Sequence, residues 1–247
     1  MAESRTRKPA CAGRFYPESP IELADQVRHF LEETSAVEGT RAVIAPHAGY
    51  PYSGAVAGES FGALPDEDAV DRAVVIGPSH FVPLDGLAMS RATSFATPLG
   101  EMPVDVEARD ALVDAGLATL EEEPHRREHS LETHLPFLQE RFGDMNIVPI
   151  VAGRASSDVV ADVLERFWDD DDTVISVSSD LSHFHTYEEA KRIDEETAEH
   201  IEALETEAIG SDQACGFVAV RGLLELARRK DLSARRLTLR NSGDATG

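Results

Sequence analysis

The chain has 247 residues, of which 42% are hydrophobic, and its formal net charge is −23. A chain of this length can bury a substantial core, so we expect one domain over residues 1–247 with a flexible tail at residues 1–10. The charge argues against a nucleic-acid or anionic-membrane surface, because such surfaces need clustered Lys and Arg. No apolar stretch of about 18 residues and no basic-then-apolar leader occurs, which favours a cytoplasmic protein without a membrane span.

The composition also bears on the environment of the protein. There are 46 acidic residues against 23 basic ones, and the lysines are limited to Lys8, Lys191 and Lys230. An acidic, lysine-poor surface stays hydrated at high salt, where screening removes its self-repulsion, so we interpret it as halophilic adaptation. An acidic mesophilic protein is the alternative. Cys11 and Cys215 lie in different sequence settings, which fits a reducing compartment better than a disulfide.

Short apolar runs alternate with segments of helical periodicity along the chain. Strands are expected at residues 42–45, 72–76, 87–89, 146–151, 173–178 and 237–239. Helices are expected at residues 20–34, 53–64, 103–117, 128–138, 157–168, 187–206 and 218–229. Ser53 is the predicted N-cap of one helix, Ser130 or a neighbour is that of residues 128–138, and residues 121–127 are predicted to form a solvated loop. This order predicts a three-layer α/β/α fold with a mostly parallel central sheet.

Three of the predicted strands run into turns that carry His47, His80 and His183. Because ligands bind outside the carboxyl ends of parallel strands, these imidazoles should meet in one crevice. His47 and His80 form a candidate metal set with Cys215 at a helix start, since imidazole suits iron, copper and zinc and a thiolate favours the softer ions. The alternative is a pair of structural, hydrogen-bonded histidines and a small buried cysteine.

Other residues could take part in proton transfer. Asp180 stands three residues before His183, so its carboxylate could orient that imidazole, or it could instead cap its own turn. His129 could face the crevice, whereas His134, five residues further, is predicted to pack in the core or to support the ligands from behind, because this spacing is not that of a zincin. The sequence has no phosphate loop, dinucleotide fingerprint or nucleophile elbow, which disfavours phosphoryl transfer, dinucleotide binding and serine hydrolysis.

These residues lie in short motifs that together resemble the Memo family. The motifs occur in the family's order over nearly the whole chain: Ala12–Pro17, Ala45–Tyr50, Gly77–His80, Glu128–Glu132, Ser179–Asp180, Cys215–Gly216 and Ser242–Asp244. The family is similar in fold to the class III extradiol ring-cleaving dioxygenases, which are LigB-like proteins with a non-haem iron. The resemblance therefore implies a class III extradiol dioxygenase-like α/β fold.

The resemblance also implies a metal triad of His47, His80 and Cys215. The thiolate stands where the dioxygenases use a carboxylate, and it alters the charge and redox preference of the metal. Non-haem iron or copper is the expected cofactor, and zinc also suits these ligands. His183 is expected to act as acid or base beside Asp180, and His129 is expected to line the crevice.

Two functions follow from the resemblance. One is a metal-dependent oxidoreductase that acts on an unknown small molecule or protein partner. The other is a non-catalytic binding or signalling protein with a vestigial pocket, since eukaryotic relatives mediate signalling through receptor phosphopeptides. Prokaryotic relatives are encoded beside AMMECR-type and radical SAM proteins, in AmmeMemoRadiSam systems, which suggests a functional link.

Residues 241–247 look like the family's loop before a terminal strand. We therefore expect either further residues or an exposed sheet edge there, which a second copy of the chain could cover in a homo-oligomer.

The charge pattern makes the stability of the protein dependent on salt. We expect the melting temperature to rise from low to molar potassium chloride, because salt screens repulsion among the 46 acidic groups. Calorimetry over a salt series measures this. A melting temperature that stays flat would contradict the halophilic interpretation.

Overall fold

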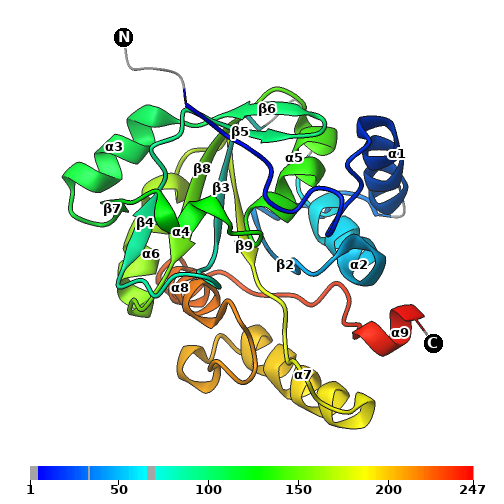
Figure 1. Ribbon diagram of the computed structural model, residues 1–247. Coiled ribbons are helices and arrows are strands. Elements are labelled where there is room, and N and C mark those ends of the chain that lie inside the picture. Colours follow the sequence, from blue (N-terminus) through cyan, green and yellow to red (C-terminus); the bar gives the residue numbers. More distant parts are fainter. Residues whose placement is uncertain (1–4, 33, 66–69, 247) are drawn as a thin grey trace.

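The protein is seen in a computed structural model that describes residues 5–32, 34–65 and 70–246 (Figure 1). Its central sheet has six strands in the order β2-β9-β3-β8-β4-β7. Their bounds are β2 Ala42–Ala45, β3 Arg72–Pro78, β4 Leu87–Met89, β7 Thr119–Leu120, β8 Asn146–Ala152 and β9 Thr173–Ser178. Only the β4–β8 pair is antiparallel among the pairings of the described residues in this sheet. The mostly parallel sheet that the sequence predicts is therefore confirmed.

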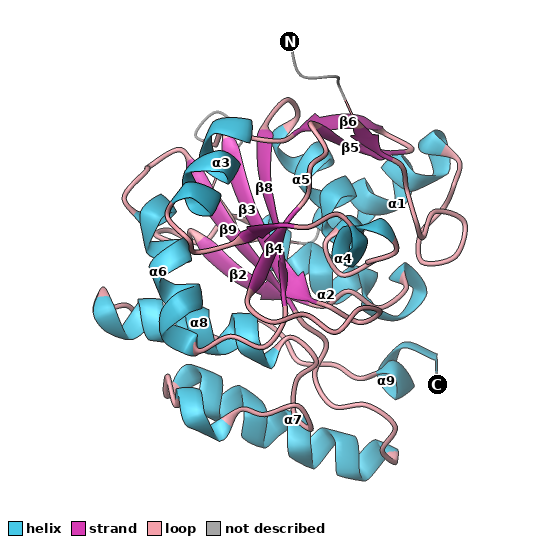
Figure 2. Ribbon diagram, turned by 60° about the vertical axis from the view of Figure 1, so that its left-hand side comes forward, coloured by secondary structure: helices cyan, strands magenta, loops and turns pink. Residues whose placement is uncertain are grey.

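Helices cover both faces of this sheet (Figure 2). Successive side chains of a strand point to opposite faces, so Ala73 and Val75 of β3 join one apolar cluster and Val74 and Ile76 join the other. The first cluster includes residues of α1 Pro20–Leu31, α2 Tyr50–Gly62 and α5 Leu135–Phe142. The second includes residues of α3 Val106–Asp114, α6 Ser157–Trp168 and α8 Phe217–Arg229. The predicted three-layer α/β/α fold is thus confirmed.

A second, three-stranded sheet lies beside the first. It consists of β1 Thr6–Arg7, β5 Ser94–Thr97 and β6 Gly100–Pro103, in the order β1-β5-β6. β1 pairs in parallel with β5, and the Arg7 side chain is buried. The prediction of a flexible tail is therefore wrong from Thr6 onward, because backbone pairing and a buried charge hold this segment; residues 1–4 lie outside the described part.

Two predicted helix starts are also wrong. α2 begins at Tyr50 because Pro51 occupies its first turn after Gly49, and the Ser53 hydroxyl donates instead to the Ala48 carbonyl at 2.8 Å. Ser130 does not cap a helix, since its hydroxyl donates to the Pro78 carbonyl at 3.1 Å. A short 3₁₀ turn, η2 Glu132–His134, follows it and leads into α5.

Residues 121–127 are more ordered than the predicted loop. They include the short helix α4 Glu123–Arg126, in which Pro124 and His125 are buried. His125 Nε2 donates to the Ala88 carbonyl at 3.0 Å, so this segment packs onto β4. The loop prediction is wrong because it followed the charged residues of this segment, whereas Pro124 and His125 among them are buried.

The end of the chain also differs from the prediction. No strand forms at residues 237–239, because Leu237 is 40% exposed and the neighbouring Arg236 binds Glu195 and Glu202 of α7 Tyr187–Glu202. Helix α9 Ser242–Thr246 follows, and β2 forms one edge of the six-stranded sheet. The remaining short element is η3 Thr206–Ala208.

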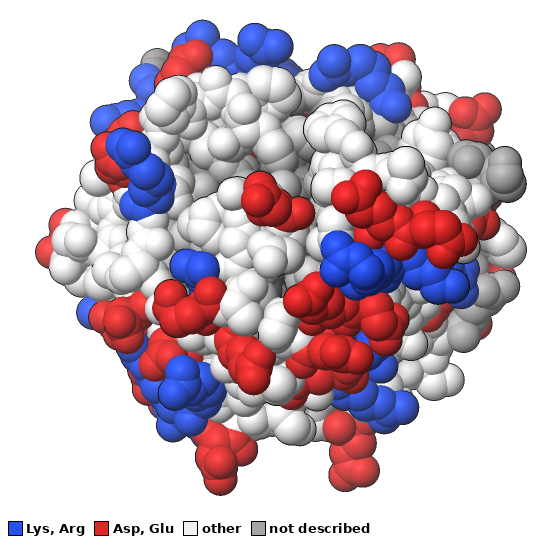
Figure 3. Space-filling model, turned by 90° about the horizontal axis from the view of Figure 1, so that it is seen from below, with Lys and Arg blue, Asp and Glu red and all other residues white. Residues whose placement is uncertain are grey.

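Figure 3 shows the molecule from below, the side on which α7 and α9 lie in Figure 1. Acidic side chains gather there around a few basic ones, in keeping with ion pairs such as those of Arg236. Among the described residues, no helix is long and apolar enough to cross a membrane.

A buried ion pair fastens the N-terminal segment to the body of the molecule. Arg7 Nη1 lies 2.6 Å from Glu132 Oε2, and the side chains are 4% and 0% exposed. Glu132 also accepts hydrogen bonds from the backbone of Ala10 and Cys11 and from the Tyr16 hydroxyl. These contacts compensate the cost of burying the carboxylate, so removing its charge leaves Arg7 buried and unpaired.

We expect Glu132→Gln to lower the free energy of unfolding by about 3 kcal/mol, because breaking one partner of a buried pair costs that much. Urea unfolding followed by circular dichroism at fixed salt measures the change. Asp85→Asn is the matched control, because it removes a carboxylate from the exposed Asp85–Arg154 pair and should leave stability unchanged. Equal stability of both variants would show that the buried network contributes nothing.

Candidate metal centre

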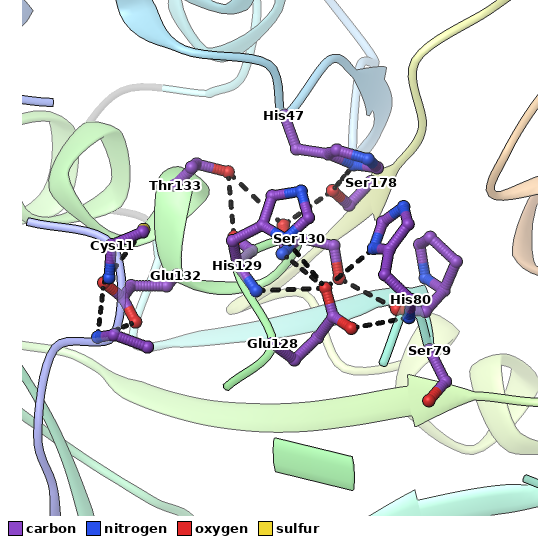
Figure 4. Close-up of polar contacts among 12 residues, drawn as sticks. Cys11, His47, Ser79, His80, Glu128, His129, Ser130, Glu132, Thr133 and Ser178 are labelled. Carbon is purple, nitrogen blue, oxygen red and sulfur yellow. Dashed lines mark hydrogen bonds and ion pairs between the residues drawn. The ribbon is translucent and has the colours of Figure 1, made fainter. Parts of the chain in front are cut away.

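Three histidines meet at the carboxyl edge of the central sheet. His47 follows β2, His80 follows β3, and His129 comes from the loop that leads to η2. One ring nitrogen from each lies within 4.8 Å of the others, so these residues, which we call the histidine cluster, could hold a metal ion. The ring centroids of His80 and His129 are 4.6 Å apart, and Figure 4 shows the three side chains side by side.

Hydrogen bonds fix the tautomer of His47. Its Nδ1 lies 2.7 Å from Ser178 Oγ, and the Ser178 hydroxyl donates its single proton to the Ser130 carbonyl at 2.6 Å. The Ser178 oxygen can therefore only accept from His47, so Nδ1 carries the proton. The lone pair of the neutral ring is left on Nε2, which lies 3.2 Å from the Cys215 sulfur.

Glu128 orients His80 in the same way. Its Oε1 lies 2.8 Å from His80 Nδ1, and its Oε2 accepts from the His80 backbone at 2.7 Å. Burial opposes ionisation of Glu128, but the hydrogen bond and charge of His80 outweigh it and lower its pKa to about 2. A carboxylate on Nδ1 is the arrangement that commonly directs Nε2 of a histidine toward a metal.

His129 is held differently. Its Nδ1 is buried and has no hydrogen-bond partner in the described part of the chain, although Glu128 Oε1 lies 3.4 Å away. Burial, with the nearby His47 and His80, lowers its pKa to about 4, so the ring is neutral at pH 7. No hydrogen bond fixes which nitrogen of His129 carries the proton.

Cys215 lies beside the cluster just before α8. Its backbone N–H donates to the Asp180 carbonyl at 3.2 Å, and the next residue must be small because a Cβ on Gly216 would lie 2.4 Å from the Ser178 carbonyl oxygen. Burial opposes ionisation of the thiol, but His47 and His80 outweigh it and lower its pKa to about 6. The side chain therefore supplies a thiolate at pH 7.

Asp180 and His183 lie next to each other, but the Asp180 side chain is mostly buried and the His183 side chain is exposed. Asp180 Oδ1 accepts from the backbone of His47 at 2.7 Å and of Ala48 at 3.2 Å, so this carboxylate holds the turn after β2. Its Oδ2 lies 3.8 Å from Nε2 of His183. The His183 side chain is 42% exposed, and its Nδ1 donates to the Leu181 carbonyl at 2.6 Å.

His134 is the packing residue that its spacing predicts. It is fully buried, and its Nε2 donates to the Pro46 carbonyl at 3.1 Å, directly before His47. The neutral ring must then accept from the Ser176 hydroxyl at 2.8 Å, in agreement with a pKa that burial lowers to about 3. His134 thus supports the turn that carries His47.

Three groups that orient the ligands were not predicted from the sequence, namely Glu128, Ser130 and Ser178. The sequence did contain a signal for Glu128, because an acidic residue directly before His129 could accept a hydrogen bond from an imidazole. Ser178 at a strand end and Ser130 in a loop carry no comparable signal, because serines are common in both places.

The residues fit a metal ion. Hydrogen bonds at Nδ1 leave Nε2 of His47 and of His80 as the nitrogen that each neutral ring can offer to a metal, and a thiolate lies beside them. Ligands at about 2.0 to 2.3 Å from one ion lie at most about 4 to 4.6 Å apart, and the 3.2 Å between His47 Nε2 and Cys215 Sγ satisfies this limit.

The fold and site define a mostly parallel α/β protein with a histidine cluster at its strand ends. A family model described as Memo-like protein matches residues 7–247. MEMO1 family proteins of Thermoplasma acidophilum and Aeropyrum pernix are each 34% identical to the chain over 98% of its length, covering 93% and 95% of their own. One of Methanosarcina mazei is 33% identical, covering 98% of this chain and 94% of its own. The chain belongs to the Memo family.

The thiolate predicts pH-dependent reactivity of Cys215. In metal-free protein we expect the rate of alkylation by iodoacetamide to rise with pH through a midpoint near 6, because the thiolate forms above its pKa. Mass spectrometry of the modified peptide measures the rate. In His47→Ala the midpoint should move up, since this ring stabilises the thiolate. Cys11 is the internal control, because burial raises its pKa and it should not react. A Cys215 midpoint above pH 8 in the parent chain would contradict the thiolate.

Proposed function

We propose that this chain is a metal-dependent oxidoreductase whose non-haem iron or copper is bound by His47, His80 and Cys215. The proposal rests on one observation above all: the Nδ1 atoms of both histidines are occupied by Ser178 and Glu128, which leaves both Nε2 lone pairs for a metal. Membership of the Memo family supports it, the histidine cluster brings His47 and His80 together, and Cys215 Sγ lies 3.2 Å from His47 Nε2.

The ligand set suits several metals. Imidazole binds iron, copper and zinc, and a thiolate favours copper(I) and zinc over harder ions. The resemblance to the class III extradiol dioxygenases that the sequence motifs imply favours iron, but the thiolate in place of a carboxylate argues against simple catechol cleavage. When bound, iron or copper would supply one-electron redox chemistry that the side chains of this site lack.

The protein's own residues would move protons. His129 is neutral at pH 7 and lies within the cluster, so it can accept a proton from a ligand bound there. His183 is the second candidate, because Asp180 lies 3.8 Å from its Nε2 and its exposure gives access to solvent. His129 would act on the ligand, and His183 would exchange protons with the medium.

A non-catalytic binding or signalling protein is the second candidate function. Exposed aromatic residues near the site, such as Phe81 at 47% exposure, favour contact with a partner or ligand. In either case we place the protein in the cytoplasm, in keeping with two free cysteines, and propose a functional link to AMMECR-type and radical SAM proteins. We propose no nucleic-acid or membrane partner, since the net charge is −23.

Metal content separates the two functions. We expect the protein, purified in high salt and loaded anaerobically with iron(II) or copper(I), to hold about one ion per chain by elemental analysis. His47→Ala, His80→Ala and Cys215→Ala should each lose most of it, because each removes one ligand.

Matched variants control for side-chain loss. Cys11→Ala removes the other cysteine and His29→Ala removes an exposed histidine, and both should keep the metal. His129→Gln tests whether the fourth residue of the site is a ligand: retained metal assigns it to proton transfer. A parent chain that holds no metal after reducing, anaerobic loading would support the non-catalytic function.

A further inference from the structure

An exposed arginine lies at the rim of the histidine cluster. Arg127 directly precedes Glu128, and its guanidinium carbon lies 5.0 Å from the ring centroid of Phe81. Among the residues that the structure describes, no ion pair involves Arg127, whereas its neighbour Arg126 binds Glu123 at 3.1 Å. The guanidinium of Arg127 is thus held by an aromatic ring and by no carboxylate of the described residues, which leaves its N–H donors for an anionic ligand.

Aromatic rings connect this arginine to the metal centre. Phe81 is 47% exposed, and its ring centroid lies 5.9 Å from that of His129 and 6.4 Å from that of His80. On another side, the ring of Phe15 lies 4.6 Å from that of His129. A ligand that extends from the cluster to the guanidinium of Arg127 would thus contact the rings of Phe15 and Phe81.

We propose that Arg127 binds the carboxylate of a small aromatic substrate whose other end reaches the metal. This inference rests on the proposed function, because the metal fixes the second end of the ligand. The planar guanidinium presents a fork of N–H donors that matches a carboxylate, and Phe81 beneath it holds the fork in place. The aromatic body of the substrate packs against Phe15 and Phe81.

The local charge favours a carboxylate over a phosphate. One guanidinium balances one negative charge, and no second unpaired cation stacks on Phe81 among the described residues. The carboxylates of Glu128 and Asp180 lie at the cluster, and the chain as a whole carries −23. A dianion would be repelled by these charges more than a monoanion.

Isothermal titration with three probes tests the inference, using zinc-loaded and metal-free protein: 4-hydroxybenzoate, phenol and phenyl phosphate. We expect the parent chain to bind 4-hydroxybenzoate more tightly than phenol. Arg127→Gln should weaken 4-hydroxybenzoate binding about fivefold to tenfold and leave phenol binding unchanged, because one charge-assisted pair is lost.

The matched control is Arg126→Gln, which removes the same charge one residue away from an arginine that is already paired. It should change binding of either probe less than twofold. An equal effect of both variants, absent binding of 4-hydroxybenzoate, or a stronger dependence of phenyl phosphate on Arg127 would overturn the inference. If the chain holds neither zinc nor the iron or copper of the loading experiment, the proposed function fails, while the preference of the metal-free protein for the acid still decides the role of Arg127.

Discussion

The carboxylate of Glu128 is the contact on which the candidate site depends. Its side chain is 1% exposed, and it accepts hydrogen bonds from the backbone and ring of His80 and from the backbone of His129 and Ser130. Burying a carboxylate without hydrogen-bond donors would destabilise the fold by several kcal/mol, so these four hydrogen bonds are what stabilises the buried charge of Glu128. Glu128 therefore joins the end of β3, which carries His80, to the loop before η2, which carries His129.

Four residues further along, Glu132 does the same for the N-terminal segment. It binds Arg7, Cys11 and Tyr16, and the segment that these residues anchor brings the Phe15 ring to 4.6 Å from His129. The Phe15 carbonyl also accepts from the backbone of Tyr50 at the start of α2. The N-terminal segment therefore lines the site. Glu128 in the loop before η2 positions the ligands, and Glu132 at the start of η2 positions the residues around them.

The sequence predicted the layers and the strand ends well, because these depend on local periodicity. An uninterrupted apolar run such as Val74–Ile76 is typical of a strand in a sheet that is buried on both faces. His80 follows this strand and therefore lies at the carboxyl edge of the sheet. The segment around Arg7 could not be predicted as ordered, because its order comes from Glu132, which lies 125 residues away. The start of α5 was missed for a related reason: Ser130 bonds to Pro78 across the sheet edge rather than to its own helix.

The protonation of the site gives an independent reason to expect a cation there. Burial disfavours a charged His80, yet the hydrogen bonds that its ring donates to Cys215 and Glu128 outweigh it and raise its pKa to about 10. The same coupling lowers the pKa of Cys215 and raises that of His47, so His47 and His80 hold their protons beside the thiolate more strongly than free imidazoles do. A metal ion can replace these protons, since it binds the neutral rings through Nε2 and the thiolate through sulfur. Metal affinity should then rise with pH, because each ligand imidazole must lose its proton before it binds, and the carboxylates of Glu128 and Asp180 would remain to balance the charge of the ion.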